Sequence, residues 1–187
     1  MEKEKDNQQQ TPTEGEIGWL AGIIEGEGTI SLSCWIRKQG TKPKIGTEIK
    51  IYNTDAGIIK KCADILERLD VGFHVSEREQ KPMRTTEGSK YGGVDPMLAV
   101  SIKTLPEAYK LGKILQPYMF GDKASRLDLM LQYLARRLKR ISDNGGNFRN
   151  CLLDYNDCKI VVDFYRKFVK KPGHNRKLVE GLLNDYK

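Results

Sequence analysis

The chain has 187 residues, a length that suits one domain with an appended subdomain. Its formal net charge of +7 favours an acidic partner, either nucleic acid or an anionic membrane surface. No apolar run approaches the ~18 residues that a membrane-spanning helix needs, and residues 1–14 lack the apolar core of a signal peptide. These features predict an intracellular protein that begins with a disordered tail over 1–14.

The first predicted elements are a helix and a two-stranded hairpin. Residues 16–25 carry apolar side chains at helical spacing, and from Thr29 the apolar spacing changes to two. A second alternating run covers 45–52, after the turn sequence KQGTKP. The two alternating runs are predicted to pair with each other.

The remaining elements repeat this order and then add helices. They are a helix within 53–72, a strand over 71–80, a polar loop over 81–93, a strand over 96–103, a helix from 104 that ends near Pro117, a long amphipathic helix over 122–141 and two helical runs within 151–187. In the third strand, Val71, Phe73 and Val75 are expected on one side. The order predicts an α+β fold, with a four-stranded antiparallel sheet that helices cover on one face.

The other face of this sheet combines hydrogen-bonding, charged and aromatic side chains. Its predicted members are Ser31, Ser33, Trp35, Arg37, Lys44, Glu48, Lys50 and Tyr52. Such a face is either the solvated side of an amphipathic sheet or, in a basic protein, a surface for nucleic acid, because two-stranded ribbons fit the major groove. The residues alone leave both interpretations open.

Three glycines recur every four residues in the first helix, at Gly18, Gly22 and Gly26. Each glycine weakens a helix by ~1 kcal/mol relative to alanine. Three on one face therefore indicate close packing against another helix, as in membrane helix pairs; the alternative is that they only fray the helix end.

Glu27 follows at the end of this helix, where unpaired carbonyls make the dipole negative and a carboxylate needs a cation. Glu27 and the Gly26 carbonyl are therefore a candidate half-site for a hard divalent cation such as Mg²⁺. If two chains pair along the glycines, two such acids come together, as two-metal phosphodiester cleavage requires.

The nine residues LAGIIEGEG, Leu20 to Gly28, resemble the LAGLIDADG motif, with glutamates in place of both aspartates. The predicted order of elements over 17–141 is similar to the αββαββα core of that family. The family comprises homing endonucleases, with RNA maturases and a few transcription regulators as relatives. The resemblance implies an endonuclease core over 15–141 with a four-stranded DNA-binding sheet, and a C-terminal helical extension over 142–187.

The resemblance also assigns roles to individual positions. Glu27 matches the acid that binds the catalytic metal, and Gly26 supplies a carbonyl. Asn53 matches a polar residue that orients solvent, and Lys123 matches the basic residue beside the scissile phosphate, where it stabilises developing charge. Glu25 is expected to hydrogen-bond at the helix interface and not to perform chemistry.

By the same resemblance the open sheet face binds DNA, and Arg78 and Lys103 join it, with Lys103 as a phosphate contact. One motif per chain implies a homodimer with Gly18, Gly22 and Gly26 at its interface. A symmetric dimer implies a pseudo-palindromic target, of which each subunit contacts one half.

The function that the resemblance implies is that of a site-specific, intron-encoded homing endonuclease. It would make a staggered double-strand break in DNA with Mg²⁺ as cofactor, or Mn²⁺ as a substitute. Two alternatives share the fold, an RNA maturase that binds intron RNA and a DNA-binding regulator without activity. No membrane partner is expected, and the expected location is a prokaryotic cytoplasm or the chloroplast or mitochondrion that encodes the protein.

Two basic runs in the C-terminal part contain no acid, ARRLKR and RKFVKKPGHNRK. The basic residues of the first run are Arg136, Arg137, Lys139 and Arg140. They are predicted to be either solvated or in contact with phosphates beside the sheet. His174, in the second run, is expected to have no catalytic role.

The four cysteines, Cys34, Cys62, Cys151 and Cys158, have no C-x-x-C spacing. Only His74 and His174 are available to complete a zinc site. Reduced and packed thiols are therefore expected in place of a zinc site.

Overall fold

The computed structural model describes residues 10–36, 43–78, 83–84, 90–91, 96–146, 151–169 and 179–183. The helices are α1 (Glu14–Glu27), α2 (Ala56–Arg68), α3 (Leu105–Leu115), α4 (Gly121–Asp143) and α5 (Tyr155–Phe168), with a 3-10 turn over Gln116–Tyr118. The strands are β1 (Gly28–Ile36), β2 (Pro43–Asn53), β3 (His74–Arg78), β4 (Met83–Arg84), β5 (Lys90–Tyr91) and β6 (Met97–Ile102). A further short helical segment covers 179–183.

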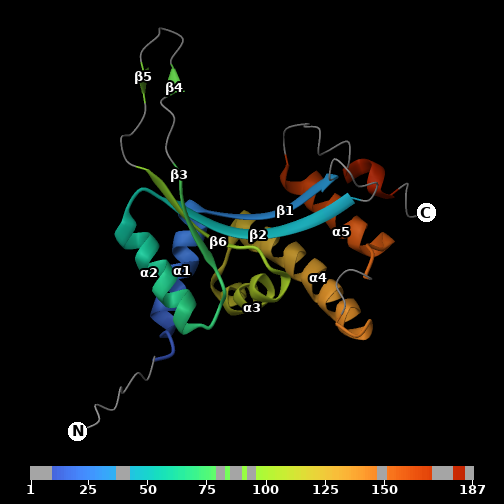
Figure 1. The fold of residues 1–187 in the computed structure, drawn as a ribbon, viewed down its shortest axis with the longest axis horizontal. Coiled ribbons are helices and arrows are strands. Elements are labelled where there is room, and N and C mark those ends of the chain that lie inside the picture. The colour runs from blue at the N-terminus through green and yellow to red at the C-terminus, as the bar shows by residue number, and fades with distance from the viewer. Residues whose placement is uncertain are drawn as a thin grey trace.

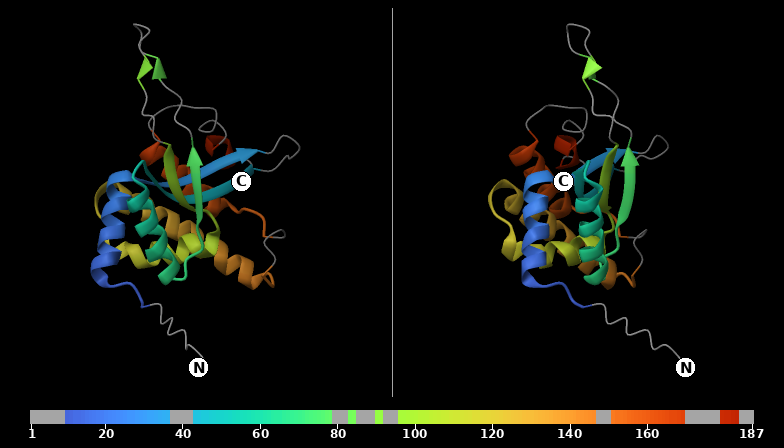
Figure 2. Two further views of the ribbon diagram at one scale, coloured as in Figure 1. Left: turned by 60° about the vertical axis from the view of Figure 1, so that its left-hand side comes forward. Right: turned by 90° about the vertical axis from the view of Figure 1, so that its left-hand side faces the viewer.

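Four strands form one antiparallel sheet in the order β1-β2-β6-β3. The helices lie on one side of this sheet (Figure 1), and the two turned views show the same two layers (Figure 2). Within the helical layer, α4 packs against β1, α1 against β2, and α2 against β6. The prediction of an α+β fold with one four-stranded sheet covered on one face is confirmed.

A single hydrophobic core joins the helices to the covered face of the sheet. Ile30 of β1, Ile49 of β2 and Ile102 of β6 lie in register across the sheet and are at most 1% exposed. The cluster extends to α5 through Val161 and Phe164. The described C-terminal helix therefore shares the core of the preceding elements.

The third strand is shorter than the alternating pattern predicts. The strand begins at His74. Val71 does not belong to it, because the Val71 N–H donates to the Leu66 carbonyl in the turn that ends α2, and the Val71 side chain is buried there. This turn places Asp70 at φ 52°, so an aspartate and not the following glycine takes the left-handed position. Val75 is 45% exposed, since β3 is an edge strand of the sheet.

The segment predicted as a polar loop over 81–93 contains the two-residue strands β4 and β5, which pair antiparallel in a separate ladder. In Figure 1 they lie above the end of β3, away from the helices.

All four cysteines are buried and free of disulfides, as expected for packed thiols. Burial raises the pKa of the Cys34 and Cys62 thiols to about 11, so both are protonated at neutral pH. Within the described ranges, no helix is long and apolar enough to cross a membrane.

The N-terminus of α1 is fixed by a capping box and an ion pair. The Thr13 hydroxyl accepts from the Glu16 N–H, and the Thr13 N–H donates to the Glu16 carboxylate at 2.8 Å. An Nη atom of Arg68 on α2 lies 2.5 Å from the same carboxylate. The hydrogen bonds from Arg68 and then from Thr13 lower the pKa of Glu16 from 4.5 to about 2.

This lowered pKa predicts a pH dependence of stability. The contribution of the Glu16 contacts is complete above pH 4.5 and is lost as the pH falls toward about 2. We expect the melting temperature of Glu16→Gln to fall less steeply over that range than the melting temperature of the wild type. Glu14→Gln, which removes the other first-turn acid of α1, is the matched control and should keep the wild-type slope. Equal slopes for all three proteins would contradict the assignment.

Candidate functional site

The candidate site begins where α1 passes directly into β1. Glu27 is the last residue of α1, and the Gly28 N–H donates to the Ile24 carbonyl as the chain turns. A Cβ atom at Gly28 would lie 2.7 Å from the Ile24 oxygen, so this turn requires glycine. The turn leaves the Glu27 side chain exposed at the end of the helix.

Lys123, in the first turn of α4, binds the carbonyl end of α1. Its ammonium donates to the Ile24 carbonyl at 2.8 Å and to the Glu25 carbonyl at 2.5 Å. A cation here adds a donor to carbonyls of the last turn of the helix, of which Ile24 O already accepts from the Gly28 N–H, and offsets the negative dipole end. The sequence therefore contains a cation for the end of α1, next to the acid predicted to bind metal.

Glu25 binds its own chain. Its carboxylate accepts a hydrogen bond of 3.1 Å from the backbone N–H of Phe120, the residue that precedes α4. Phe120 has no side-chain cap of its own, so Glu25 ties the start of α4 to the end of α1. The hydrogen bond that the sequence predicts for Glu25 is thus made within the chain, while its non-chemical role stays a prediction.

The Glu27 carboxylate, in contrast, makes no hydrogen bond or ion pair with any residue that the structure describes. Its hard oxygen atoms fit a divalent cation such as Mg²⁺. The described part of the chain contains no group of three or more His, Cys, Asp or Glu side chains placed to hold a metal ion.

Asn53 lies at the same end of the sheet as Glu27. The β1–β2 register pairs Gly28 with Ile51, which brings the last residue of β2 beside the end of α1. The Asn53 side-chain oxygen accepts from the Asp55 N–H at 2.8 Å, and Asp55 in turn caps α2. Asn53 is therefore held at the strand end by the turn that follows it.

The register places the predicted DNA-contacting residues on one face of the sheet, opposite the helices. Ser31 pairs with Glu48, Trp35 with Lys44, and Lys50 lies between Thr29 and Ser101. The described members of the set on this face are Ser31, Ser33, Trp35, Lys44, Glu48, Lys50, Tyr52, Arg78 and Lys103. Arg37 lies outside the described residues.

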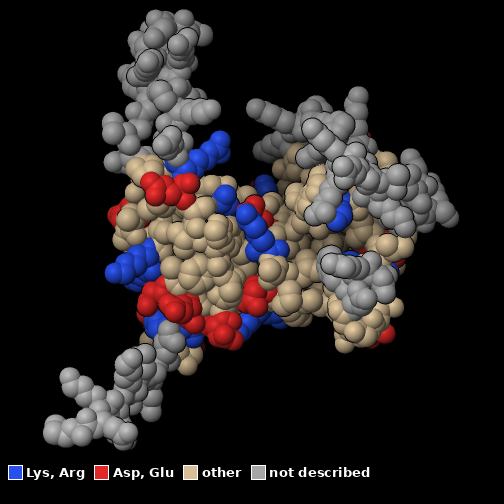
Figure 3. All heavy atoms as spheres, viewed as in Figure 1, with Lys and Arg blue, Asp and Glu red and all other residues tan. Residues whose placement is uncertain are grey.

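Several of these side chains contact one another. The Lys50 ammonium lies 4.4 Å from the centre of the Tyr52 ring, and Lys103 pairs with Glu48 at 3.5 Å. Trp35, 41% exposed, lies against Gly46, where a Cβ atom would come within 2.6 Å of the indole. Figure 3 shows Lys and Arg atoms at the upper edge of the described surface, with a group of acidic atoms beside them at the upper left and further acidic groups at the lower left.

Beyond the predicted set, this face includes His74, for which the sequence predicts a place on the DNA face or the surface, and three residues that the sequence interpretation missed. His74 pairs with Ser101 and Ser76 with Ala99, so all four face the same way as Lys50 and Tyr52. The signal was present in the alternation of the third strand, since its odd-numbered residues were expected on the apolar side.

The three glycines of α1 differ in their surroundings. A Cβ atom at Gly22 or Gly26 would meet no atom within 4 Å, whereas one at Gly18 would lie 3.8 Å from the Tyr118 ring. Phe120, 71% exposed, follows two residues after Tyr118. No residue in the described part of the chain therefore covers the middle of the glycine face of α1, and an exposed aromatic ring lies nearby.

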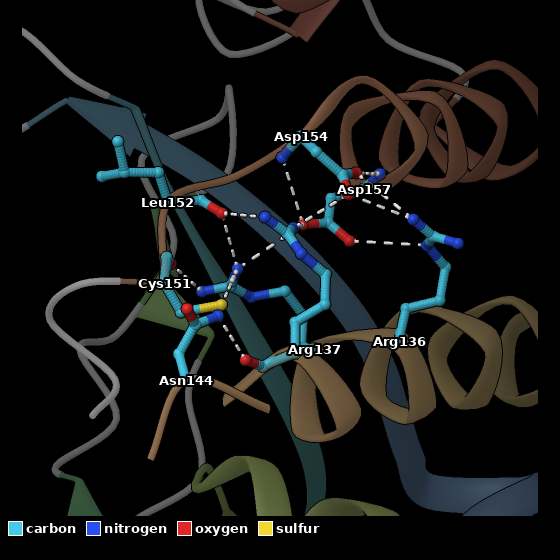
Figure 4. A network of polar contacts seen from close by, with 8 residues as sticks. Arg136, Arg137, Asn144, Cys151, Leu152, Asp154 and Asp157 are labelled. Carbon is cyan, nitrogen blue, oxygen red and sulfur yellow. Dashed lines mark hydrogen bonds and ion pairs between the residues drawn. The ribbon is translucent and has the colours of Figure 1, made fainter. Parts of the chain in front are cut away.

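The basic run of α4 binds α5, so the prediction that it is solvated or contacts phosphates is wrong for Arg137, whose side chain is 4% exposed, while Arg136 and Arg140 pair with acids and stay partly exposed. Arg136 and Arg140 lie 3.1 and 3.0 Å from the Asp154 carboxylate (Figure 4). Arg137 and Arg140 lie 3.5 and 2.5 Å from the Asp157 carboxylate, whose side chain is fully buried. We call these five residues the α4–α5 ion-pair network.

The α4–α5 ion-pair network has a physical origin. The N-terminus of α5 brings Asp154 and Asp157 together in a capping box, and a buried carboxylate needs cations. Burial raises the pKa of Asp157, and Arg137 and Arg140 oppose that rise. Of the second basic run, Arg166 and Lys167 are exposed on α5, while residues 170–177, including His174, lie outside the described residues.

A cavity of about 830 Å³ lies away from Glu27, at the far end of β2. Apolar side chains of α4 and of 151–153 line it, together with Trp35 and Lys44. The acid, the lysine and the asparagine of the candidate site thus lie at the opposite end of the sheet from this cavity.

No protein-family model and no curated protein matches this chain. Several solved structures are similar to it. I-CvuI in complex with its target has a TM-score of 0.60 and 17% identity, over 91% of this chain and 93% of that one. The archaeal intron-encoded homing endonuclease I-Vdi141I, complexed with DNA, has a TM-score of 0.60 and 15% identity, over 91% and 96%. The LAGLIDADG meganuclease I-CpaMI, bound to DNA, has a TM-score of 0.58 and 17% identity, over 90% of this chain but 48% of its own. The chain therefore has the fold of the LAGLIDADG homing endonucleases.

Proposed function

We propose that this protein is a homodimeric, site-specific DNA endonuclease of the homing type. It would hydrolyse one phosphodiester bond in each strand of a long pseudo-palindromic site with a divalent metal, leaving staggered ends. The observation that carries the proposal is the exposed Glu27 carboxylate, which no described residue engages, at the point where the glycine face of α1 meets the open face of the sheet.

Double-stranded DNA is the partner that this surface fits. The face carries lysine, arginine, serine and aromatic side chains on adjacent strands, and the chain has a net charge of +7. Such a curved ribbon places side chains against base edges, and its cations contact phosphates. The similar structures of I-CvuI, I-Vdi141I and I-CpaMI each hold DNA, which supports this assignment.

A second copy of the chain is the partner that the glycine face fits. Gly22 and Gly26 leave room for another helix backbone to approach closely, and pairing by a two-fold axis would bring two Glu27 residues together. The chain spans nearly all of I-CvuI and I-Vdi141I but about half of I-CpaMI. A chain that matches two of these endonucleases over nearly their whole length and half of the third supports a protein that acts as one of two subunits.

The residues at the end of α1 would divide the chemistry among them. Glu27 and the Gly26 carbonyl would hold Mg²⁺, or Mn²⁺ in its place, together with phosphate oxygens of the DNA. When bound, the ion supplies Lewis-acid neutralisation of the phosphate and lowers the pKa of water. Lys123 keeps the end of α1 in place and puts a positive charge near the developing charge on phosphorus. Asn53, held by the Asp55 N–H, would orient a water molecule.

Glu27 also separates this proposal from the regulator that shares the fold. A carboxylate beside a DNA-binding face repels phosphate, so a protein that only binds DNA has no use for it. An exposed acid that no described residue engages therefore favours hydrolysis over binding alone.

The dimer proposal predicts that Gly22→Leu yields a folded monomer. Among the described residues of one chain, a Cβ atom at Gly22 meets nothing within 4 Å, and Gly22 is exposed, so we expect the fold to tolerate the leucine. Across a close helix pair the added side chain would force the helices apart. We expect sedimentation to show a dimer for the wild type and a monomer for Gly22→Leu, with cleavage lost. Lys60→Leu, an exposed apolar substitution on α2, is the control and should stay dimeric; a dimeric Gly22→Leu would overturn the glycine interface.

The whole proposal is tested by incubating the protein with a randomised duplex DNA library in Mg²⁺ and sequencing the cut ends. We expect one recurrent site with approximate two-fold symmetry, cut in both strands at staggered positions. Specific binding without any cut site would reject the endonuclease in favour of the regulator. Specific binding of intron RNA without DNA cleavage would favour the maturase.

A further inference from the structure

The C-terminal helix α5 has no part in the proposed chemistry, yet it is firmly attached to the core. The α4–α5 ion-pair network fixes its first turn, and Arg137 also donates to the Cys151 carbonyl at 2.8 Å and to the Leu152 carbonyl at 3.0 Å (Figure 4). Near its other end, the Arg126 guanidinium of α4 lies 4.7 Å from the centre of the Phe168 ring. Both ends of α5 are thus held against α4.

One residue of α5 reaches the sheet. β1 is an edge strand, and such a strand presents unpaired N–H and C=O groups on its outer side. The Cys34 N–H donates to the Tyr165 hydroxyl oxygen at 3.3 Å, and this contact is buried. Tyr165 is 7% exposed and Cys34 is 0% exposed, so the protein shields this contact from solvent.

Cys34 lies between two residues of the proposed DNA-binding face. Because side chains alternate along a strand, Cys34 points to the core while Ser33 and Trp35 point to the open face. The Ser33 hydroxyl donates to the Gly46 carbonyl at 3.4 Å, and the Trp35 ring lies on Gly46. The backbone position at Cys34 therefore sets where both side chains lie over β2.

We infer that Tyr165 is a positioning residue for DNA recognition: its hydroxyl holds the outer half of β1, and with it Ser33 and Trp35, in the place where they contact bases. The inference rests on the proposed function. In this role α5 supports the outer edge of β1. Tyr165 would then affect base preference without contacting DNA itself.

Tyr165→Phe is the decisive variant, because it keeps the packed ring and removes only the acceptor. The buried Cys34 N–H then loses its hydrogen-bond acceptor, which is unfavourable. Because β1 is an edge strand, we expect this part of it to shift so that the N–H reaches water. Asp154→Asn is the matched control. It loosens α5 through the α4–α5 ion-pair network, retains an N-cap side chain, and leaves the Cys34 contact in place.

The experiment selects bound sequences from a randomised duplex library in chelator, so that no strand is cut. Trp35→Ala first defines the base positions that Trp35 controls. We expect Tyr165→Phe to relax base preference at those same positions and to weaken binding of the best site about ten-fold, within the range that one unpaired buried group produces. Asp154→Asn should keep the wild-type preferences at every position even if its melting temperature falls.

A second measurement follows Trp35 directly. The chain has two tryptophans, so in a Trp19→Phe background Trp35 is the sole fluorophore. Acrylamide quenching of Trp35 should increase in Tyr165→Phe and stay unchanged in Asp154→Asn.

Unchanged base preferences and unchanged quenching in Tyr165→Phe would overturn the inference. The inference would also be overturned if Tyr165→Phe and Asp154→Asn both lost base preference at all positions. That result would mean that any loosening of α5 weakens recognition, without a specific role for the Tyr165 hydroxyl. A wild type that selects no sequence would reject the proposed function, and the inference with it. If the wild type selects a site and Tyr165→Phe selects the same site with the same base preferences, only the inference is rejected.

Discussion

Glu27→Gln is expected to lower the rate of DNA cleavage by about 10³-fold or more, because the metal contributes several kcal/mol to transition-state stabilisation and each 1.36 kcal/mol is a factor of ten. The amide keeps the shape of the carboxyl group but loses the negative charge that binds a hard cation. DNA binding should stay the same or tighten slightly, since one negative charge leaves the DNA-binding side. The melting temperature should not change, because Glu27 is exposed. Single-turnover cleavage and a binding isotherm on the same duplex measure both quantities.

Glu25→Gln is the matched control for this prediction. Glu25 is two residues away and carries the same charge, but its carboxylate accepts from the Phe120 N–H. A glutamine oxygen also accepts that hydrogen bond, so cleavage should stay within a few-fold of the wild type. Normal cleavage by Glu27→Gln, or an equal loss in Glu25→Gln, would show that the metal-binding acid has been misassigned.

The largest effect on stability is expected from Asp157→Ala in the α4–α5 ion-pair network. Its carboxylate is fully buried, and Arg137, which lies 3.5 Å away, is 4% exposed. Removing one side of a buried ion pair leaves charge without compensation, which typically costs about 3–5 kcal/mol. The loss of the capping box at the start of α5 adds to this cost. Denaturant unfolding monitored by circular dichroism measures the change in the free energy of unfolding.

Asp163→Ala, on the same helix but outside the α4–α5 ion-pair network, is the comparison. It should change the free energy of unfolding by less than about 1 kcal/mol, as substitutions away from buried partners do. Equal free energies for the two variants would mean that the network adds nothing to stability. Asp157→Asn retains a capping side chain and separates the lost charge from the lost cap.

The sequence predicts the turn from α1 into β1 well, because two local signals agree there. The apolar spacing changes from the helical period to two at Thr29, and the glycine between them is the residue that the turn requires. The hairpin partner and the faces of β1 and β2 follow from the same alternation. Local chemistry thus suffices for the position of Glu27 and for the members of the open face.

The pairing of charged side chains was not predictable in this way. Whether Arg136 and Arg140 face solvent or acids depends on which helix packs on α4, and the periodicity of the sequence does not tell which helix that is. Likewise, Lys123 binds carbonyls of α1 almost 100 residues earlier in the chain. Tertiary contacts of this kind leave no periodic signal in the sequence.

The measurement that most directly tests this account is single-turnover cleavage of the selected duplex by the wild-type protein, with each strand end-labelled, in Mg²⁺ and in excess chelator. We expect both strands to be cut at staggered positions in Mg²⁺ and neither to be cut in chelator, while binding persists in both. Cleavage at the same rate in chelator, or tight binding with both strands intact in Mg²⁺, would contradict this account.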